Sequence, residues 1–272
     1  MIVSNGALTT IKDVQAYEDE RNVEISQVGI SGLRLPLEFA NGGKSQHTVM
    51  EAAFTVTLQK ERKGTHMSRF IEVWDMQPKP FSLEGVGILL QDLKTKLDAP
   101  QAQASLQFPL FFEREAPVSK AKSLMDFECG IDVELCEDEA DSSYTLHLMA
   151  PVTSLCPCSK EISEFSAHSQ RSHLTITLEF KDFTSFAALE IDQLLKTMES
   201  VGSSKLYPLL KRPDEKYVTE HAYKNPQFVE DLVRDLVVLL RERTDLLAFS
   251  VQSENFESIH NHQAYAKVNY IF

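Results

Sequence analysis

Two cysteines and a histidine lie close together in one polar segment of this chain. Cys156 and Cys158 flank Pro157, and His168 follows ten residues after the second cysteine. A thiolate and an imidazole form a ligand pair that suits zinc and similar metals. A zinc finger would show two complete ligand pairs, whereas fewer than four protein ligands leave a position open for water, as in catalytic sites. The spacing also leaves open a redox dithiol, a cysteine nucleophile and ordinary loop cysteines.

A third ligand for such a metal would have to come from elsewhere in the chain. The candidates are Glu215, His221, His260 and His262. Judged on the residues alone, Glu215 fits a charged turn around Pro213 better than it fits a metal site. The two histidines His260 and His262 fit a polar hairpin turn as well as they fit a site.

Two further segments carry charges that could bind a ligand. Glu230 lies at the edge of the apolar stripe of an expected helix, where it pairs with Arg234 one turn on or points into a pocket. The segment 60–70 gathers four basic residues around a glycine, which suits phosphate binding as well as a solvated hairpin turn. The segment has neither the Walker nor the dinucleotide-binding glycine pattern, so side chains would have to hold any phosphate.

The elements that must position these residues can be predicted from hydrophobic periodicity. Residues 1–45 are polar and interrupted by glycines, which predicts an irregular N-terminal arm. Alternation with a period of two predicts strands over 50–58, 66–74, 104–112, 127–135, 144–150, 174–180, 247–256 and 264–271. Helical spacing predicts helices over 83–97, over 191–198 and from Asn225-Pro226 to about residue 240.

This order of elements predicts an α+β fold with antiparallel strands and helices packed on one face. The plan is repeated, so we expect two tandem modules after the arm, one over 46–121 and one over 122–272. The second module would carry most of the residues that could do chemistry.

Composition narrows the possible partners and the compartment. The chain has 272 residues, a net charge of −13 and a pI near 5.1, which argue against binding to nucleic acid or anionic membranes. No apolar run approaches the ~20 residues of a membrane helix, and the first residues do not form a secretory signal. Four cysteines are too few for a disulfide scaffold. We therefore expect a cytoplasmic protein.

The cysteine segment resembles the signature of a known enzyme family. Leu155–Ser163 together with Ala167–Ser172 is similar to the signature of the type IB GTP cyclohydrolases, prokaryotic enzymes that open folate biosynthesis. Further segments similar to that family are 63–70, 207–220, 225–231 and 257–262, so the resemblance extends from about residue 28 to near the C-terminus. Ser166, Ser169 and His221 depart from it, standing where Gly, Asn and Arg are expected.

The resemblance implies the tunnelling fold, two modules per subunit and a homotetramer with active sites at subunit interfaces. It implies one divalent metal per site, zinc or manganese with iron as a further option, held by Cys156, His168 and Glu215. Glu230 would anchor the guanine ring, and Cys158 and His260 would transfer protons. Candidates for the triphosphate are Lys63, Arg69, Lys160 and Arg171.

The implied reaction converts GTP and water to formate and 7,8-dihydroneopterin triphosphate, the first step of tetrahydrofolate biosynthesis. Water activated by the metal would attack C8 of the guanine. Two alternatives are another tunnelling-fold enzyme, such as a nitrile reductase that uses Cys158 as nucleophile, and a catalytically silent metal-binding module.

Overall fold

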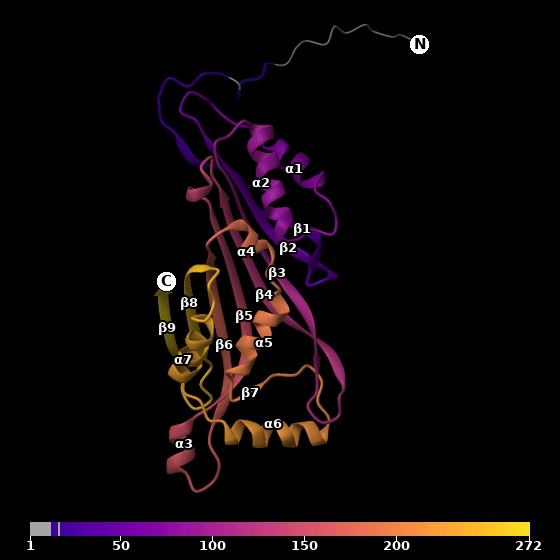
Figure 1. Ribbon diagram of the computed structural model, residues 1–272, viewed down its shortest axis with the longest axis vertical. Helices are drawn as coiled ribbons and strands as arrows, with labels where there is room; N and C mark the ends of the chain where they lie inside the picture. Colours follow the sequence, from indigo (N-terminus) through magenta and orange to yellow (C-terminus); the bar gives the residue numbers. More distant parts are fainter. Residues whose placement is uncertain (1–11, 16) are drawn as a thin grey trace, which may run out of the picture.

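One antiparallel sheet runs through the whole molecule (Figure 1). The computed structural model describes residues 12–15 and 17–272. The strand order is β1-β2-β3-β4-β5-β6-β8-β9, and the short β7 pairs with β5. The strands are β1 (Ile25–Asn41), β2 (Lys44–Leu58), β3 (Ala102–Glu115), β4 (Lys122–Leu135), β5 (Ser143–Leu155), β6 (Ser169–Phe180), β7 (Ser204–Lys205), β8 (Leu246–Asn255) and β9 (Ala264–Ile271).

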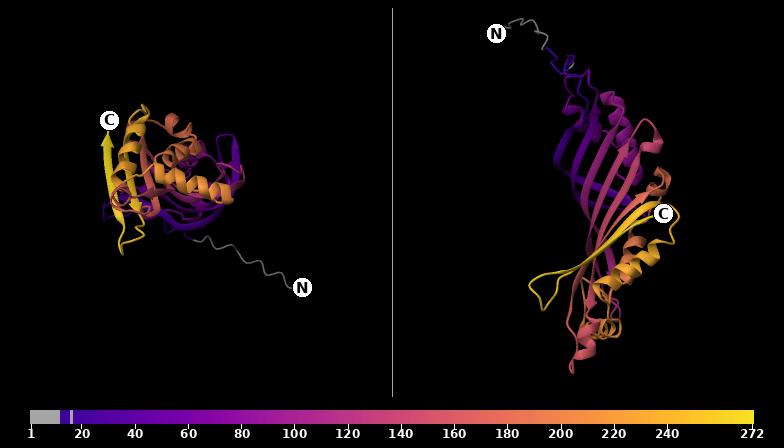
Figure 2. Two further views of the ribbon diagram at one scale, coloured as in Figure 1. Left: turned by 90° about the horizontal axis from the view of Figure 1, so that it is seen from below. Right: turned by 90° about the vertical axis from the view of Figure 1, so that its left-hand side faces the viewer.

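The helices lie on one face of this twisted sheet (Figure 2). They are α1 (Ser68–Asp75), α2 (Leu83–Leu97), α3 (Pro157–Ile162), α4 (Phe183–Ala187), α5 (Ile191–Ser200), α6 (Arg212–Lys224) and α7 (Val229–Leu240). α2 packs on β2, β3 and β4, whereas α5 packs on β5, and α7 packs on β6, β8 and β9. In the part of the chain that the structure describes, no helix is long and apolar enough to cross a membrane.

Helix α2 shows how the sequence builds the covering layer. The Ser82 hydroxyl caps the helix by accepting from the Gly85 N–H (3.2 Å), and Asp98 ends it in a left-handed conformation. The apolar residues at helical spacing face the sheet and are all buried: Leu83, Val86, Leu89, Leu90, Leu93 and Leu97. The helix predicted over 83–97 is therefore confirmed.

Two local predictions are wrong. Most of the segment 66–74, expected as a strand, belongs to α1, which begins at Ser68 and in which Phe70, Val73 and Trp74 are buried at the i, i+3, i+4 spacing of a helix. Residues 25–41, expected as part of an irregular arm, form strand β1. Register shifts between Ile25 and Val28 and between Ile30 and Leu33 break its alternation, which conceals the strand from a test for period two.

The fold class is confirmed, with both halves sharing one sheet. The predicted boundary between residues 121 and 122 falls in the turn between β3 and β4, so β1 to β3 with α1 and α2 precede it, and β4 to β9 with the other helices follow it. Strands β4 and β5 pair directly, so the two helical layers lie side by side on a continuous sheet.

A buried ion cluster ties the two halves together. Arg114 on β3 donates to Glu199 (2.9 Å) and Asp192 (2.9 Å), both on α5, and its guanidinium lies over the ring of Phe127. The side chains of Arg114 and Glu199 are 7% and 0% exposed. Removing one partner of a buried pair leaves an uncompensated charge, which is strongly destabilising.

Glu199→Gln is therefore expected to lower the free energy of unfolding by about 3 kcal/mol. Thermal melts at fixed protein concentration measure this as a drop in Tm of roughly 5–10 °C. Lys196→Ala is the control, because it removes only the exposed partner of Asp192 (2.8 Å) and should cost less than about 1 kcal/mol. A Glu199→Gln protein that melts like the parent would contradict the role of the cluster.

Candidate functional site

Cys156 and His168 lie at the ends of two neighbouring strands. β5 and β6 pair up to Leu155 and Ser169, and the Cys156 N–H then donates to the His168 carbonyl (3.1 Å). The Ser159 hydroxyl donates to the Cys156 carbonyl (3.1 Å) and accepts from the His168 N–H (3.2 Å). Strand pairing thus places residues twelve apart in sequence next to each other.

The loop between these two residues contains the short helix α3. Cys156 is its N-cap, and the sulfur accepts from the Ser159 N–H (3.4 Å). Cys158 is exposed on the first turn. Ser166 has a φ of 67°, a left-handed conformation that favours glycine. The serine that departs from the family signature therefore occupies a position where glycine would be unstrained.

One pocket brings four of the predicted site residues together. Cys156 and His168 line it from the β5–β6 connection, Glu230 from the first turn of α7, and His260 from the β8–β9 loop. The rings of His260 and His262 stack there with centroids 5.0 Å apart. The two residues predicted as metal ligands, a carboxylate and an imidazole therefore share one cavity.

Glu230 is available to a ligand because its expected partner is engaged elsewhere. Arg234 forms an ion pair with Asp231 (3.1 Å) and not with Glu230, as one of the two alternatives for Glu230 required. Glu230 lies in the first turn of α7, where the helix dipole favours a negative charge.

Glu215 lies outside this pocket, near the start of α6. Its carboxylate is exposed and pairs with Arg212 (3.0 Å). The neighbouring Asp214 is buried and accepts from the N–H groups of Val118 and Ser119 (both 2.8 Å). Burial would raise the pKa of Asp214, but these hydrogen bonds and those from the Ser119 hydroxyl and the Lys211 N–H hold it well below its usual range. The start of α6 is thus anchored to the β3–β4 turn.

The other end of α6 lies near the pocket. Lys160 on α3 donates to the carbonyl of Tyr223 (2.5 Å), and its ammonium lies over the ring of that residue. Tyr223 follows Glu215 by eight residues, which is about 12 Å along a helix axis. The Lys160 ammonium, predicted to bind triphosphate, is engaged in an intramolecular contact.

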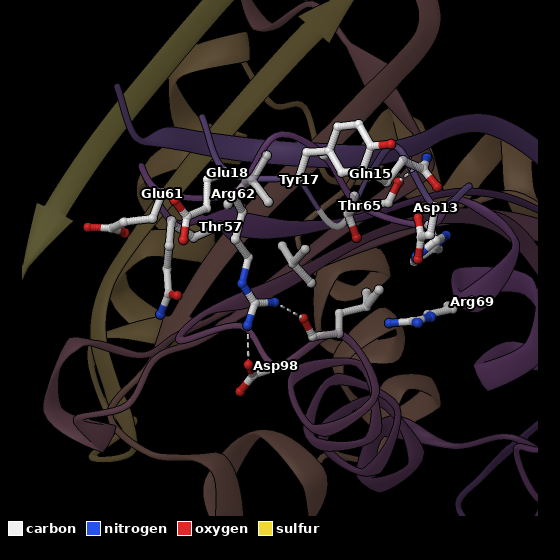
Figure 3. Close-up of a pocket in the computed structure, with 16 residues that line it drawn as sticks. Asp13, Gln15, Tyr17, Glu18, Thr57, Glu61, Arg62, Thr65, Arg69 and Asp98 are labelled. Carbon is white, nitrogen blue, oxygen red and sulfur yellow. Dashed lines mark hydrogen bonds and ion pairs between the residues drawn. The ribbon is translucent and has the colours of Figure 1, made fainter. Parts of the chain in front are cut away.

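The remaining predicted phosphate ligands lie away from the pocket. Lys63 and Arg69 belong to the end of the molecule opposite α3 and α6 (Figure 1), where Arg69 lines a second pocket that Arg62 crosses to reach Asp98 (Figure 3). Arg171 is exposed and alternates along β6 with the buried Gln170, which places it on the open face of the sheet. The structure thus does not bring Lys63, Arg69 or Arg171 to the pocket.

Cys156 and His168 fit a metal as two of its protein donors. A thiolate and an imidazole are both good ligands for zinc, and an imidazole is also a good ligand for iron. Within residues 12–15 and 17–272, no group of three or more His, Cys, Asp or Glu side chains is arranged to hold a metal ion. Of the three predicted metal ligands, Cys156 and His168 line the pocket and Glu215 does not.

Two pocket residues escaped the sequence analysis as individual site residues. Gln170 Oε1 lies 3.0 Å from His168 Nδ1, and a Glu257 carboxylate oxygen lies 3.7 Å from the same nitrogen. Glu257 is the first residue of the segment 257–262, whose similarity to the enzyme family does not single out this glutamate. Gln170 is a single polar residue in a strand, and the hydrophobic periodicity of that strand does not indicate a functional role for it.

Comparison with solved structures defines the class of fold. A uricase from Bacillus fastidious superposes with a TM-score of 0.57 at 8% identity, covering 93% of this chain and 94% of that one. Urate oxidase from Bacillus subtilis 168 superposes with a TM-score of 0.53 at 8% identity, covering 90% and 98%. The chain therefore has the tunnelling fold, with a cysteine–histidine pocket at the end of the sheet.

Sequence comparison defines the family. The model of the type I GTP cyclohydrolase FolE2 family matches residues 11–266. GTP cyclohydrolase FolE2 of Aromatoleum aromaticum is 47% identical over 260 residues, covering 95% of this chain and 93% of that one. The FolE2 protein of Neisseria gonorrhoeae is 45% identical over 265 residues, covering 97% and 100%. The chain belongs to the type I GTP cyclohydrolase FolE2 family.

Proposed function

We propose that this chain hydrolyses GTP to formate and 7,8-dihydroneopterin triphosphate, the first step of tetrahydrofolate biosynthesis. The observation that carries the proposal is the single pocket lined by Cys156, His168, Glu230 and His260 in a member of this family. Two metal donors beside a carboxylate and an imidazole suit ring hydrolysis of a purine. The four free thiols suit a reducing compartment, so we place the reaction in the cytoplasm.

Cys156 and His168 would hold one divalent metal, with zinc, manganese and iron as the candidates. When bound there, such an ion lowers the pKa of a coordinated water and supplies a nucleophile near neutral pH. The side chains that line the pocket would orient the guanine base of GTP toward the metal. Glu230 accepts two hydrogen bonds, from the guanine N1–H and the 2-amino group, a pairing that adenine cannot make.

Proton transfer during opening of the imidazole and ribose rings requires groups that can both give and take a proton. His260 lies in the pocket and can do both. Cys158 is the second proton-transfer group in this proposal. It would act from the exposed side of α3, which is open to a neighbouring subunit.

The positions of the remaining residues support a homotetramer with active sites between subunits. Glu215, Lys63 and Arg69 do not line the pocket of their own chain. Helix α6 buries only Asp214 and Ala222, so most of its surface is available to a second copy. We propose that Glu215 completes the metal site of a neighbouring subunit, and that Lys63 and Arg69 reach its triphosphate.

Metal-depleted protein incubated with GTP tests this function. Zn²⁺, Mn²⁺ or Fe²⁺ is expected to restore both formate and a fluorescent oxidised pterin, with neither product formed in the absence of metal. Cys156→Ala should abolish both products, whereas Cys136→Ala, which changes a buried cysteine outside the pocket, should keep them.

Other outcomes would favour the alternatives. NADPH consumption with a deazapurine nitrile, without a metal requirement, would indicate a nitrile reductase. Bound metal and an intact oligomer with no turnover of GTP would indicate a catalytically silent module.

A further inference from the structure

A buried polar cluster lies beneath the pocket. On the helix-covered face of β6 the apolar residues Leu174, Ile176 and Leu178 give way to Ser172 and Gln170 at the pocket end. Ser154 on β5 and Asn255 on β8 continue this polar layer, with exposed fractions of 0% and 2%. Buried polar groups are costly unless they are hydrogen-bonded, so the direction of each bond in such a layer is constrained.

The Ser154 hydroxyl orients the centre of this cluster. Its single hydrogen is donated to the carbonyl of Gln227 (2.9 Å), so its oxygen can only accept from other partners. It accepts from Asn255 Nδ2 (3.2 Å) and Gln170 Nε2 (3.4 Å). Asn255 Oδ1 in turn accepts from the Ser172 hydroxyl (2.6 Å). Both amide NH₂ groups therefore point toward Ser154.

Glu257 confirms the same orientation of the Gln170 side chain. Gln170 Nε2 also lies 3.4 Å from Glu257 Oε1, and a carboxylate oxygen only accepts hydrogen bonds. The amide oxygen of Gln170 must then face the opposite way, 3.0 Å from His168 Nδ1. An oxygen acceptor at that distance requires the hydrogen on Nδ1.

We infer that Gln170 and Glu257 are positioning residues that hold His168 in the Nδ1–H tautomer and leave its Nε2 lone pair for the metal. The hydrogen bond at one imidazole nitrogen sets which nitrogen can act as a ligand. Glu257 orients Gln170 and lies 3.7 Å from Nδ1, where its charge favours the same proton position. Only the metal-binding step of this inference rests on the proposed function.

The tautomer can be measured without metal and without turnover. In metal-free protein labelled with ¹⁵N-histidine, the imidazole nitrogen shifts of His168, assigned by their loss in His168→Asn, should report Nδ1–H. Gln170→Met removes both the acceptor and the donor at similar size, and should give a mixture of tautomers. Glu257→Gln removes the carboxylate charge beside Nδ1, while the Ser154 hydroxyl still accepts from Gln170 Nε2. A smaller shift toward the mixture than in Gln170→Met is therefore expected.

Metal affinity supplies the second readout. Competition with a chelator should show Zn²⁺ bound about 10–100-fold more weakly by Gln170→Met than by the parent protein, as for other residues that orient a metal-binding histidine. Gln252→Met is the matched control, because Gln252 lies on β8 outside the cluster and bonds Tyr265 on the surface. That variant should keep both the tautomer and the affinity of the parent.

An Nε2–H tautomer in the parent protein would overturn the inference, as would a Gln170→Met protein with unchanged tautomer or unchanged Zn²⁺ affinity. Failure of the proposed function is recognised separately: the parent protein would then release no formate from GTP with any metal, while the metal-free spectrum still reads the tautomer.

Discussion

Glu230→Gln is expected to lower kcat/KM for GTP by about 10²–10⁴-fold. The carboxylate would accept two hydrogen bonds from the guanine edge, and hydrogen bonds to charged groups contribute about 1.5–3 kcal/mol each. Their sum of about 3–6 kcal/mol corresponds to that range, because each 1.4 kcal/mol is about tenfold. Glutamine keeps one acceptor but loses the charge that strengthens its hydrogen bond, and it presents an NH₂ group to the other donor of the base. One bond is therefore weakened and the other is replaced by a repulsive contact.

Inosine triphosphate, which lacks the 2-amino group, tests whether Glu230 makes this contact. The parent protein should prefer GTP strongly, and Glu230→Gln should reduce that preference because one of the two hydrogen bonds no longer distinguishes the bases. Glu242→Gln makes the same chemical change at an exposed position just beyond the C-terminal end of α7 and should leave both rates unchanged. If Glu230→Gln preserved the ratio of the two rates, the guanine contact would belong to another residue.

Much of the fold was accessible from sequence because its elements are regular. The strands from β2 onward alternate cleanly, and α2 carries a capping serine before an apolar stripe. β1 was missed because bulges shift its register, and α1 was missed because eight residues are too few to separate a helical period from alternation. In both segments the hydrophobic pattern is too short or too interrupted to identify the element, so tertiary packing decides the structure.

The site was accessible only in part for a different reason. Cys156 and His168 lie next to each other because β5 and β6 pair with each other as far as Leu155 and Ser169, the residues adjacent to them. A prediction of the two strands can anticipate this placement. Gln170 acquires its role from its hydrogen bond to His168, two residues away, and from its contact with Glu257 in the β8–β9 loop. The placement of Glu215 depends on where the α6 helix lies, and no spacing in the sequence encodes that distance.

The location of Glu215 leads to a prediction about mixed oligomers. Cys156→Ala and Glu215→Gln should each lose about a hundredfold or more in metal affinity. Structural zinc sites bind with about 10–16 kcal/mol shared among four ligands, or about 3 kcal/mol per ligand. Formate release at limiting metal should fall with it. Each variant alone is therefore expected to be nearly inactive under that condition.

If Glu215 serves the pocket of a neighbouring subunit, mixing the two variants should restore activity. In a randomly reassembled 1:1 mixture, a site is intact when its pocket chain carries Cys156 and its neighbour carries Glu215, which holds for about a quarter of the sites. Unfolding and refolding the two variants together, followed by the formate assay, measures this recovery. Glu220→Gln, an exposed carboxylate five residues further along α6, provides the control and should be active alone.

A mixture that stays as inactive as its components would show that Glu215 acts within its own chain. That result would require α6 to move, because its start is held at the β3–β4 turn by three hydrogen bonds that Asp214 accepts from Val118 and Ser119. Recovery of about a quarter of the activity would exclude such a movement. A site closed within one chain would lack either Cys156 or Glu215 in both variants, so mixing them could not restore it. The mixture therefore separates a site shared between subunits from one closed by a rearranged helix.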